Sequence, residues 1–282
     1  MRVPLHIVEA RRRKLAALLG KHRYLPIGEL CRFLGVSEAT ARRDLNALAK
    51  SNVVTRTRGG ALSEYNERFP SFRERRMGGT EAKHLIARAA LRLMQPHGTY
   101  FFDSGTTIHA LAEAFLENPV SPVKIITSNL PVGELLSDIP DVQIFLLAGQ
   151  LLGRQSVLLG ETACKSLAFW QFDIAFLSAE AANREGLWNS QSMIVEQQLA
   201  ASARATHTVF CVDSRKIGLS APFLLKPWNP ADFFLTDAPK KILSKAGIPC
   251  DKSRLIPTNP GAKLPDLTPP TLGDQSLPVH FL

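Results

Sequence analysis

Two short amphipathic segments on either side of Gly35 constrain the fold of this chain more than any other feature. In the first segment, apolar residues recur at i, i+3, i+4 and i+7, the spacing of one helix face: Ile27, Leu30, Cys31 and Leu34. Pro26 suits the first turn of this helix, because its missing N–H costs little there. Gly35 can adopt the positive φ at which helices commonly end. Two short helices joined by a glycine-containing turn are the signature of a helix-turn-helix.

The second helix of the pair is predicted to begin after Ser37. The Ser37 hydroxyl can cap this helix by accepting a backbone N–H. An apolar stripe recurs at i, i+4 and i+7 (Ala41, Leu45, Leu48), and the polar residues off it face outward: Thr40, Arg42, Arg43 and Asn46. Short polar side chains followed by two arginines suit a helix that enters a DNA major groove. The pattern alone is equally typical of an ordinary amphipathic helix with a basic surface.

The residues around these two helices favour the DNA-binding interpretation. A further short helix with a basic start is predicted at 10–19, and residues 53–62 (VVTRTRGGAL) predict a β-hairpin that turns at Gly59-Gly60. A hairpin directly after a recognition helix is typical of a winged helix. Its Arg56 and Arg58 would contact phosphates or enter the minor groove. The alternative is a basic surface hairpin on an unrelated helical domain.

Positive charge is concentrated in the first quarter of the chain. Residues 1–76 hold 17 of the 34 Lys and Arg but only 7 of the 25 Asp and Glu, so they account for the net charge of +9. A basic domain joined to a near-neutral one indicates a polyanionic partner for the first domain alone. The 282 residues are 45% hydrophobic and 21% charged, which is ordinary for a soluble protein with one small and one large domain.

The remaining global features predict a cytoplasmic protein. The four cysteines are scattered without metal-site spacing, and Cys31 and Cys211 lie in apolar patterns that predict buried free thiols in a reducing compartment. The N-terminus lacks the apolar core of a signal peptide, and we expect no membrane span. We also expect no metal site and no cofactor.

From Thr80 onward, helix and strand patterns alternate. Buried strands are predicted at 99–103, 124–127, 142–149, 172–179, 207–213 and 231–237, with helices at 85–93, 109–116, 161–169, 191–205 and 239–246. Such alternation predicts an α/β domain with a largely parallel sheet. In a sheet of this kind, ligands bind at the C-terminal ends of the strands.

Residues suited to binding an anion follow four of these strands. Ser104-Gly105-Thr106-Thr107 comes after the first strand and opens a helix, where free N–H groups and hydroxyls make an anion cradle. The other strand ends contribute hydroxyls, an amide, small residues, an acid and a base: Ser128, Asn129, Gly149, Asp213 and Lys216. Loops often carry serine and glycine, so each element is weak alone. Together they predict a pocket for a small polyhydroxylated anion.

The predicted recognition helix and wing are specific enough to suggest a family. The helix reads Val36-Ser37-x-x-Thr40-x-Arg42-Arg43-Asp44-Leu45, and the wing ends in Gly59-Gly60-Ala61. This segment resembles the winged helix-turn-helix of the DeoR/GlpR family of bacterial transcription regulators. The resemblance implies six residues that read or clamp DNA: Ser37, Thr40, Arg42, Arg43, Arg56 and Arg58. Asp44 is expected to be a helix-surface or arginine-orienting group.

The rest of the chain resembles the effector domain of the same family, whose fold is similar to ribose-5-phosphate isomerase and the coenzyme A transferases. The family's Asp-Ser-Gly-Thr-Thr stands at 103–107, and its Asp-x-Ser-Lys-Phe-Gly reads DSRKIG at 213–218. Its Thr-Asn-Ser element is reordered at 127–129, and its glycine pair is Ala148-Gly149. In the family this domain senses phosphorylated intermediates of sugar metabolism. The resemblance adds Asp103 to the site and implies that 104–107 hold a phosphate, while Asp213 and Lys216 meet phosphate or hydroxyls.

Two departures from the family pattern bear on the ligand. A helix that often carries a pocket-facing Lys reads IVEQQLAASA at 194–203, with Glu196, Gln197 and Gln198. Leu152 stands where a basic residue is common. These changes leave the identity of the effector open and are compatible with a less highly charged one.

The connecting and terminal segments set the expected domain boundaries. Residues 63–79 are polar, and their Phe69, Phe72, Arg73 and Arg75 form either a packing segment between domains or a solvated hinge. Prolines are dense from 249 onward, so we expect a short strand near 253–256 and then an extended tail. The expected organisation is a winged helix-turn-helix at 7–62, a linker at 63–79, an α/β effector-sensing domain at 80–256 and a proline-rich tail at 257–282.

The sequence as a whole predicts a DNA-binding regulator of carbohydrate-metabolism genes, a repressor rather than an activator, controlled by a phosphorylated sugar. One short recognition helix makes too few contacts for specific binding, so we expect a homo-oligomer, dimer or tetramer, on repeated half-sites of double-stranded operator DNA. The main alternative is a sugar-phosphate isomerase-like enzyme with an accessory DNA-binding module, with Asp103, Glu180, Asp213 and Lys216 as acid and base. A nonspecific nucleoid-type binder is the third. No nucleophile motif is assembled, so we expect no catalytic residues.

Overall fold

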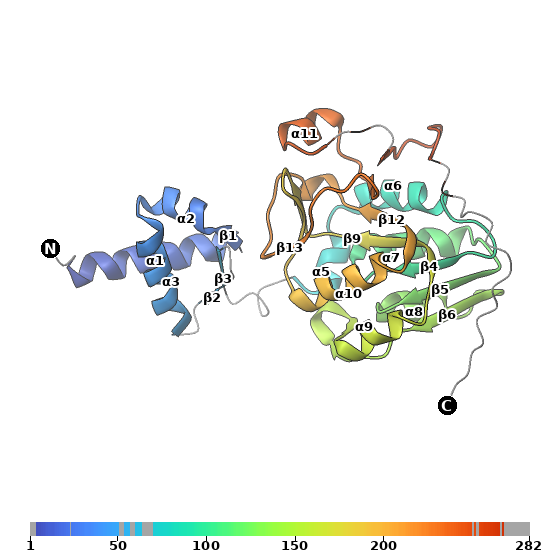
Figure 1. Ribbon diagram of the computed structural model, residues 1–282, viewed down its shortest axis with the longest axis horizontal. Helices are drawn as coiled ribbons and strands as arrows, with labels where there is room; N and C mark the ends of the chain where they lie inside the picture. Colours follow the sequence, from blue (N-terminus) through green and yellow to red (C-terminus); the bar gives the residue numbers. More distant parts are fainter. Residues whose placement is uncertain are drawn as a thin grey trace.

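The computed structural model describes residues 4–22, 24–50, 54–56, 60–63, 70–249, 251, 254–265 and 267. These residues form a small N-terminal body and a larger C-terminal body (Figure 1). The first contains helices α1 to α3 and a small sheet. The second is organised around a seven-stranded sheet.

The N-terminal domain packs three helices around a small apolar core. These are α1 (Leu5–His22), α2 (Ile27–Leu34) and α3 (Glu38–Lys50). The core residues come from the predicted stripes, from α1 and, for Leu25, from the short segment before α2: Leu15, Leu19, Leu25, Leu30 and Leu45. Gly35 ends α2 with φ 63° and ψ 37°, which confirms the predicted glycine turn. The helix predicted at 10–19 extends further at both ends, because no proline interrupts residues 5–22.

The predicted wing is present as an antiparallel hairpin directly after α3. It consists of β2 (Val54–Arg56) and β3 (Gly60–Ser63), with Arg56 opposite Ala61. A third strand, β1 (Tyr24–Pro26), pairs with β3 on its other side. The sequence analysis missed β1 because three residues are too few to show a strand period.

A parallel sheet forms the centre of the C-terminal domain and confirms the predicted fold class. The strand order is β15-β14-β12-β9-β4-β5-β6, and every neighbouring pair is parallel. The strands are β4 (Thr99–Phe102), β5 (Val123–Thr127), β6 (Val142–Leu146), β9 (Phe172–Ser178), β12 (Ala205–Cys211), β14 (Phe233–Leu235) and β15 (Leu255–Ile256).

Helices cover both faces of this sheet (Figure 1). One apolar core includes residues of α6 (Thr80–Leu91), α7 (Thr106–Glu117) and α8 (Leu130–Leu136). The other includes residues of α9 (Glu161–Leu167), α10 (Ser192–Ser202) and α11 (Lys240–Lys245). Within β4, Tyr100 and Phe102 join the first core and Phe101 joins the second, because successive strand residues point to opposite faces.

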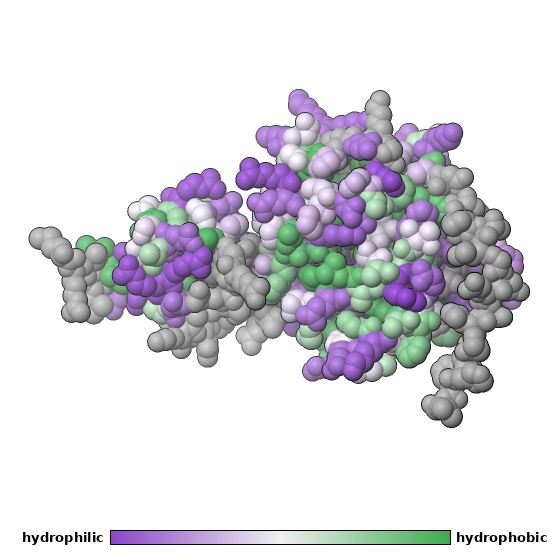
Figure 2. Space-filling model, in the orientation of Figure 1, coloured by the Kyte–Doolittle hydropathy of each residue, from purple (hydrophilic) through white to green (hydrophobic). Residues whose placement is uncertain are grey.

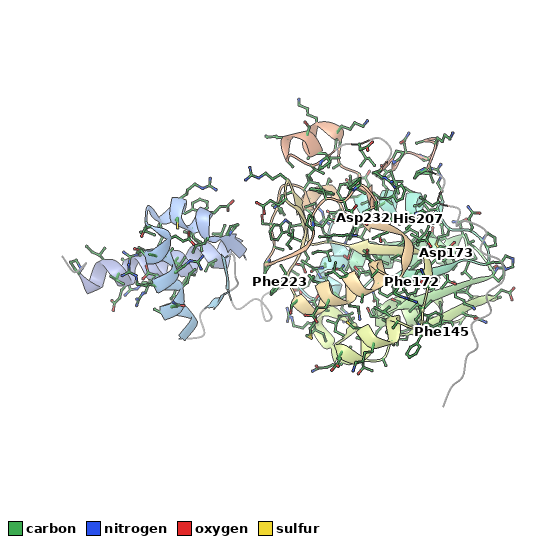
Figure 3. The ribbon with its side chains drawn as sticks, viewed as in Figure 1. Phe145, Phe172, Asp173, His207, Phe223 and Asp232 are labelled. Carbon is green, nitrogen blue, oxygen red and sulfur yellow. The ribbon has the colours of Figure 1, made fainter. Side chains whose placement is uncertain are left out.

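The prediction that 142–149 is a buried strand is wrong. β6 lies at the edge of the sheet, and its Phe145 and Leu146 are 37% and 44% exposed. Figure 3 labels Phe145 on this outer strand. An apolar run of this length is equally compatible with a central strand and with an edge strand, because neighbouring strands decide its burial.

Two small antiparallel sheets were not predicted. In one, β7 (Gln150–Leu152) pairs with β8 (Val157–Leu159). In the other, β11 (Gly186–Asn189) lies between β10 (Ala181–Asn183) and β13 (Phe223–Lys226). These strands have three or four residues, which is too short for a clear alternation of apolar and polar residues.

Helix α5 (Phe72–Met77) lies in the segment predicted as a linker. Ser71 and Glu74 form a capping box: the Ser71 hydroxyl accepts the Glu74 N–H at 3.3 Å, and the Glu74 carboxylate accepts the Ser71 N–H at 2.7 Å. Phe72 is buried with its ring 5.3 Å from the ring of His109 in α7. The described part of this segment is therefore packed on the C-terminal domain rather than solvated.

The described residues after β15 are also docked. Arg92 donates hydrogen bonds to the carbonyls of Asn259 at 3.3 Å and Ala262 at 2.8 Å. Leu264 and Leu267 pack against the first sheet core. β15 confirms the predicted short strand, and the prolines beyond it exclude long helices without preventing attachment to the core.

Candidate DNA-binding surface and effector cavity

The start of α3 presents four of the six residues predicted to contact DNA. Ser37 and Arg43 are exposed, while Thr40 and Arg42 are partly buried. Figure 2 shows a strongly hydrophilic surface over this part of the N-terminal domain. Arg42 donates its Nε to Glu38 at 2.8 Å, and Arg43 donates its Nε to the Ala39 carbonyl at 3.2 Å. An exposed pair such as Arg42–Glu38 contributes little, so a DNA phosphate can recruit Arg42 at small cost.

Ser37 occupies the N-cap position, but its hydroxyl is used differently from the prediction. The hydroxyl lies 3.1 Å from the Thr40 hydroxyl, and the Ser37 carbonyl accepts the N–H groups of Thr40 and Ala41, each at 3.0 Å. The predicted side-chain cap is replaced by a hydroxyl pair because both short side chains lie on the same side of the first turn. This pair faces the surface that the arginines also occupy.

Asp44 of α3 joins this helix to α1 through its carboxylate. Its carboxylate is 2% exposed and accepts the Nε of Arg11 at 2.6 Å and of Arg12 at 3.0 Å. The helix-surface alternative for Asp44 is therefore wrong, and the arginine-orienting alternative applies to α1. A carboxylate used in this way orients α3 and does not read bases.

For the wing, the structure describes the backbone of residues 54–56 and 60–63. Arg56 is the last residue of β2, and Arg58 lies outside the described residues. The hairpin nevertheless places residue 56 next to the loop that joins β2 to β3.

Asp103 anchors the loop between β4 and α7. Its carboxylate is 1% exposed and accepts the Ser178 N–H at 2.9 Å, the Ser178 hydroxyl at 2.8 Å and the Gln198 amide at 2.7 Å. Gly105 lies so close to Ser178 that a Cβ atom there would be 2.1 Å from Oγ. Asp103 and Gln198 thus hold the loop in place from behind.

α7 begins directly after this loop, with Gly105 in the N-cap position and no side-chain cap. The first N–H groups of a helix have no partner inside it, and Thr106, which carries one of them, lines the cavity in front of the loop. The positive end of the helix dipole adds to this preference for an anion.

At the neighbouring strand end, Ser128 and Asn129 are fully buried, whereas Gly149 at the next one is exposed. Ser128 donates its hydroxyl to Gln197 at 2.7 Å, and the buried side-chain oxygen of Thr107 has no hydrogen-bond partner among the described residues, nor has the Asn129 amide. Gly149 is pressed against β8, since a Cβ atom would be 2.6 Å from the Leu159 carbonyl oxygen. The departures at Gln197 and Gln198 therefore supply internal hydrogen bonds to the loops.

A cavity of about 490 Å³ opens in front of the Ser104–Thr107 loop. Its lining includes three of the predicted effector residues, Thr106, Asp213 and Lys216. A smaller recess of about 20 Å³ is lined by Ser104 and Gly105 and shares Lys216 with the larger cavity. The structure thus brings these five predicted residues together. The other five line neither cavity: Asp103, Thr107, Ser128, Asn129 and Gly149.

The inner wall of the cavity carries more cations than acids. We define this inner wall as six residues: Arg75, Lys83, Glu180, Asp213, Arg215 and Lys216. Burial, followed by the charges of Lys216 and Arg215, lowers the pKa of Lys83 from 10.5 to about 8. Burial also lowers the pKa of Lys216, against the opposing effect of Asp213. Burial alone would raise the pKa of Asp213, but Lys216 and Arg215 bring it below its ordinary value.

Two of these cations also hold the end of α5. Lys83 donates its Nζ to the Arg75 carbonyl at 2.5 Å and to the Arg76 carbonyl at 3.3 Å. Arg215 donates one nitrogen to the Gly78 carbonyl at 3.0 Å and its Nε to Asp213 at 2.8 Å. Gly79 has φ 64°, and a Cβ atom there would lie 2.0 Å from Arg215 Cζ, so a substitution would strain the backbone and displace Arg215.

Three of the cavity's cations were not among the predicted effector residues: Arg75, Lys83 and Arg215. Lys83 does carry a signal, because it precedes Ile86, Ala87 and Ala90 by three, four and seven residues and so falls on the buried face of α6. A lysine at such a position indicates a specific partner. Arg215 carries no comparable signal, since its contact with Gly78 spans 137 residues.

Several general expectations can be compared with the described residues. Within them, no helix is both long enough and apolar enough to span a membrane. The same part of the chain contains no group of His, Cys, Asp and Glu arranged to hold a metal ion. Cys211 is a buried free thiol as predicted, whereas Cys31 is free but only partly buried.

Comparisons with known proteins agree with this architecture. The DeoR-like helix-turn-helix domain matches residues 11–67, and the DeoR C terminal sensor domain matches residues 79–238. The glycerol-3-phosphate regulon repressor of Escherichia coli (strain K12) is 30% identical over 226 residues, covering 80% of this chain and 89% of its own length. The HTH-type transcriptional repressor GlcR of Bacillus subtilis (strain 168) is 28% identical over 222 residues, covering 78% and 84%.

Among solved structures, ribose 5 phosphate isomerase A from Neisseria gonorrhoeae is similar with a TM-score of 0.34 and 14% identity. That match covers 48% of this chain and about half, 52%, of the isomerase chain. The curated relatives, by contrast, are named as transcriptional repressors and regulators and not as enzymes. With the sensor model alone spanning more than half of the sequence, the chain belongs to the DeoR family and is a DNA-binding transcriptional regulator rather than an enzyme.

Proposed function

We propose that this regulator represses genes of carbohydrate metabolism and that a phosphorylated sugar in the 490 Å³ cavity controls its affinity for DNA. The names of two relatives support the proposal, a glycerol-3-phosphate regulon repressor and a lactose phosphotransferase system repressor. Because the operator is chromosomal DNA, the protein acts in the cytoplasm.

The excess of positive charge at the inner wall is the observation that carries the phosphate assignment. Four cations there face two acids, Glu180 and Asp213. Two further acids border the cavity but have other partners: Glu29 is paired with Arg32, and Glu74 accepts from Ser71. A phosphate group carries about −1.5 to −2 charges near neutral pH, so one phosphate balances the excess.

The rest of the site suits the sugar. Ser104, Thr106 and the N-terminus of α7 supply hydroxyl and N–H donors for the phosphate. Carboxylates accept hydrogen bonds from sugar hydroxyls, and Glu180 already accepts one from the Ser190 hydroxyl at 2.5 Å. A ligand with one anionic end and several hydroxyls therefore fits both sets of groups.

On the DNA side, Ser37, Thr40 and Arg43 contact base edges, and Arg42 clamps a phosphate. Arg56 and Arg58 act from the wing. One such helix buries too little surface for specific genomic binding, so the protein works as a homo-oligomer, dimer or tetramer, on repeated half-sites. The winged helix-turn-helix at 7–62 and the sensor at 80–256 are its working parts, joined at 63–79 and followed by the tail at 257–282.

Thermal-shift screening of the full chain tests the effector assignment. Each phosphorylated compound is paired with its unphosphorylated form, such as glycerol 3-phosphate with glycerol and glucose 6-phosphate with glucose. A true effector raises the unfolding midpoint, its unphosphorylated partner does not, and the same compound releases operator DNA in fluorescence anisotropy. Equal stabilisation by both members of every pair contradicts the phosphate assignment, and stabilisation without any change in DNA binding contradicts the regulatory role.

A further inference from the structure

Arg75 lies on the connection between the two domains and also in the effector cavity. Its helix α5 stands between the wing strand β3, which ends at Ser63, and the first sensor helix, α6. Residue 75 falls outside both matched families, which span 11–67 and 79–238. Yet Arg75 lines both the 490 Å³ cavity and the small recess under the Ser104–Gly105 loop.

We infer that Arg75 is a ligand of the effector's phosphate and that the bound phosphate clamps α5 onto the sensor domain. The inference rests on the proposed function, because it requires an anion in this cavity. It gives the connection between the domains a direct part in effector binding.

The composition of the recess supports Arg75 as a ligand. Ser104 and Gly105 come from the loop at the start of α7, and Lys216 and Arg75 supply two positive charges to the same small space against one acid, Glu180. Gln155 is 4% exposed and accepts a hydrogen bond from the Arg75 guanidinium at 2.5 Å, which fixes the direction of that side chain. A guanidinium oriented in this way matches two phosphate oxygens at once.

Electrostatics support the clamp. The Arg75 charge contributes, after burial, to the lowered pKa of both Lys83 and Lys216, so docking of α5 brings like charges together. Backbone carbonyls of α5 and Gly78 offset part of this repulsion through Lys83 and Arg215. An anion among the cations removes the repulsion and leaves these contacts in place, because an ammonium has three donors and a guanidinium has five.

The attachment of α5 restricts the DNA-binding domain. Only eight residues, 64–71, separate the end of β3 from the start of α5. A phosphate that fastens α5 therefore limits the positions that the winged helix can take relative to the sensor domain. The effector selects among domain arrangements because it binds the arrangement with α5 docked more tightly than the others.

A matched pair of variants tests the inference. Arg75→Gln and Arg73→Gln each remove one positive charge from α5, but Arg73 is exposed and lines neither cavity. Inorganic phosphate is the probe, calorimetry on the full chain measures its affinity, and hydrogen exchange of residues 70–79 measures the attachment of α5. In the wild type and in Arg73→Gln, phosphate binds and slows exchange at 70–79. In Arg75→Gln, phosphate binds at least tenfold more weakly and slows exchange no further.

The outcomes separate this inference from the proposed function. Unchanged phosphate affinity in Arg75→Gln, or phosphate binding to the wild type without slower exchange at 70–79, overturns the inference alone. Absence of saturable binding of phosphate and of every sugar phosphate to the wild type overturns the proposed function with it. A purely structural Arg75 would speed exchange without phosphate and leave phosphate affinity unchanged. If Arg75→Gln does not fold, Arg75→Lys, expected to bind phosphate several-fold more weakly, decides by the same two measurements.

Discussion

The winged helix and the sensor cavity both concentrate positive charge, but they hold it in opposite environments. On α3, Arg43 is exposed and the Arg42 side chain is 43% exposed. In the cavity, Lys83 is 3% exposed and Lys216 lies 3.7 Å from Asp213. Exposed arginines keep their charge and suit an extended polyanion, whereas buried lysines lose charge readily and suit one small anion. The degree of burial of these cations, rather than the sign of their charge, distinguishes the DNA-binding surface from the cavity.

The largest expected effect is on the stability of the winged helix, whose DNA-binding surface on α3 is held by the buried carboxylate of Asp44. Asp44→Asn leaves Arg11 and Arg12 without their carboxylate and should lower the free energy of unfolding by about 2–4 kcal/mol. Urea unfolding of the full chain, followed by circular dichroism, measures the loss. Glu38→Gln, which removes only an exposed pair, is the control and should cost less than about 1 kcal/mol. Equal losses in the two variants would show that Asp44 does not fix α3 on α1.

The next substitution should change the response to the effector and leave DNA binding without effector unchanged. Thr106→Ala removes a hydroxyl at the start of α7 and should abolish release of DNA by the effector, with at least a tenfold loss of effector affinity. DNA affinity without effector should stay within about twofold, because Thr106 lies in the sensor domain. Anisotropy titrations with the compound found by thermal shift measure both quantities. Thr162→Ala, an exposed threonine on α9, is the control; a normal response in Thr106→Ala removes this residue from the phosphate site.

On the DNA side, Arg43→Ala should weaken operator binding by about 1–3 kcal/mol if Arg43 reads a base. Arg42→Ala should cost less, because Arg42 is already paired with Glu38. Anisotropy on an operator selected from random DNA, and on random DNA at the same salt concentration, measures the difference. An equal loss on both DNAs would make Arg43 a phosphate clamp.

The smallest effect is a difference in pH dependence between the two regions. Lys83 has a pKa of about 8, so it loses its charge as pH rises through that value, and phosphate affinity should fall by up to about tenfold per pH unit above it. Arginine-mediated binding to random DNA should not change between pH 7 and 9, since arginine stays protonated. Calorimetry at several pH values checks this, with Lys83→Arg as the control that should remove the part of the decline that Lys83 causes.

The same shift sets a direction for stability. Because the folded pKa of Lys83 lies below the ordinary 10.5, the unfolded chain binds more protons between about pH 8 and 10.5. The free energy of unfolding should therefore gain a contribution that rises with pH across this window. Lys83→Met, which has no charge to bury, should lack that contribution.

Local sequence patterns predicted which helices, strands and turns form, but they did not predict which strands lie next to each other. The Gly35 turn, the hairpin and the alternating strands follow from residue spacing within short windows, and all of these are present. The edge position of β6 depends on which strands pair with it, which no local window contains. The sequence therefore defined the elements of the sheet but not which strand forms its margin.

The candidate site shows the same division. The loop at 104–107 was visible as a motif, but the role of Asp103 depends on Ser178 and Gln198, which lie 75 and 95 residues away. Lys83 was detectable as a lysine on an apolar helix face. For Arg75 and its neighbours the sequence leaves a packing segment and a solvated hinge equally open, because only the folded chain brings Arg75 to the loop at Ser104.

The strand order of the sensor sheet also has a consequence for biosynthesis. Among the described side chains, the small core of the winged helix joins residues before position 49, whereas β4 pairs with β9 and the cavity is lined by Asp213 and Lys216. Domains fold as units during translation, N-terminal first, and local contacts form faster than distant ones. The winged helix of a nascent chain can therefore fold on the ribosome well before the chain that completes the cavity has been made.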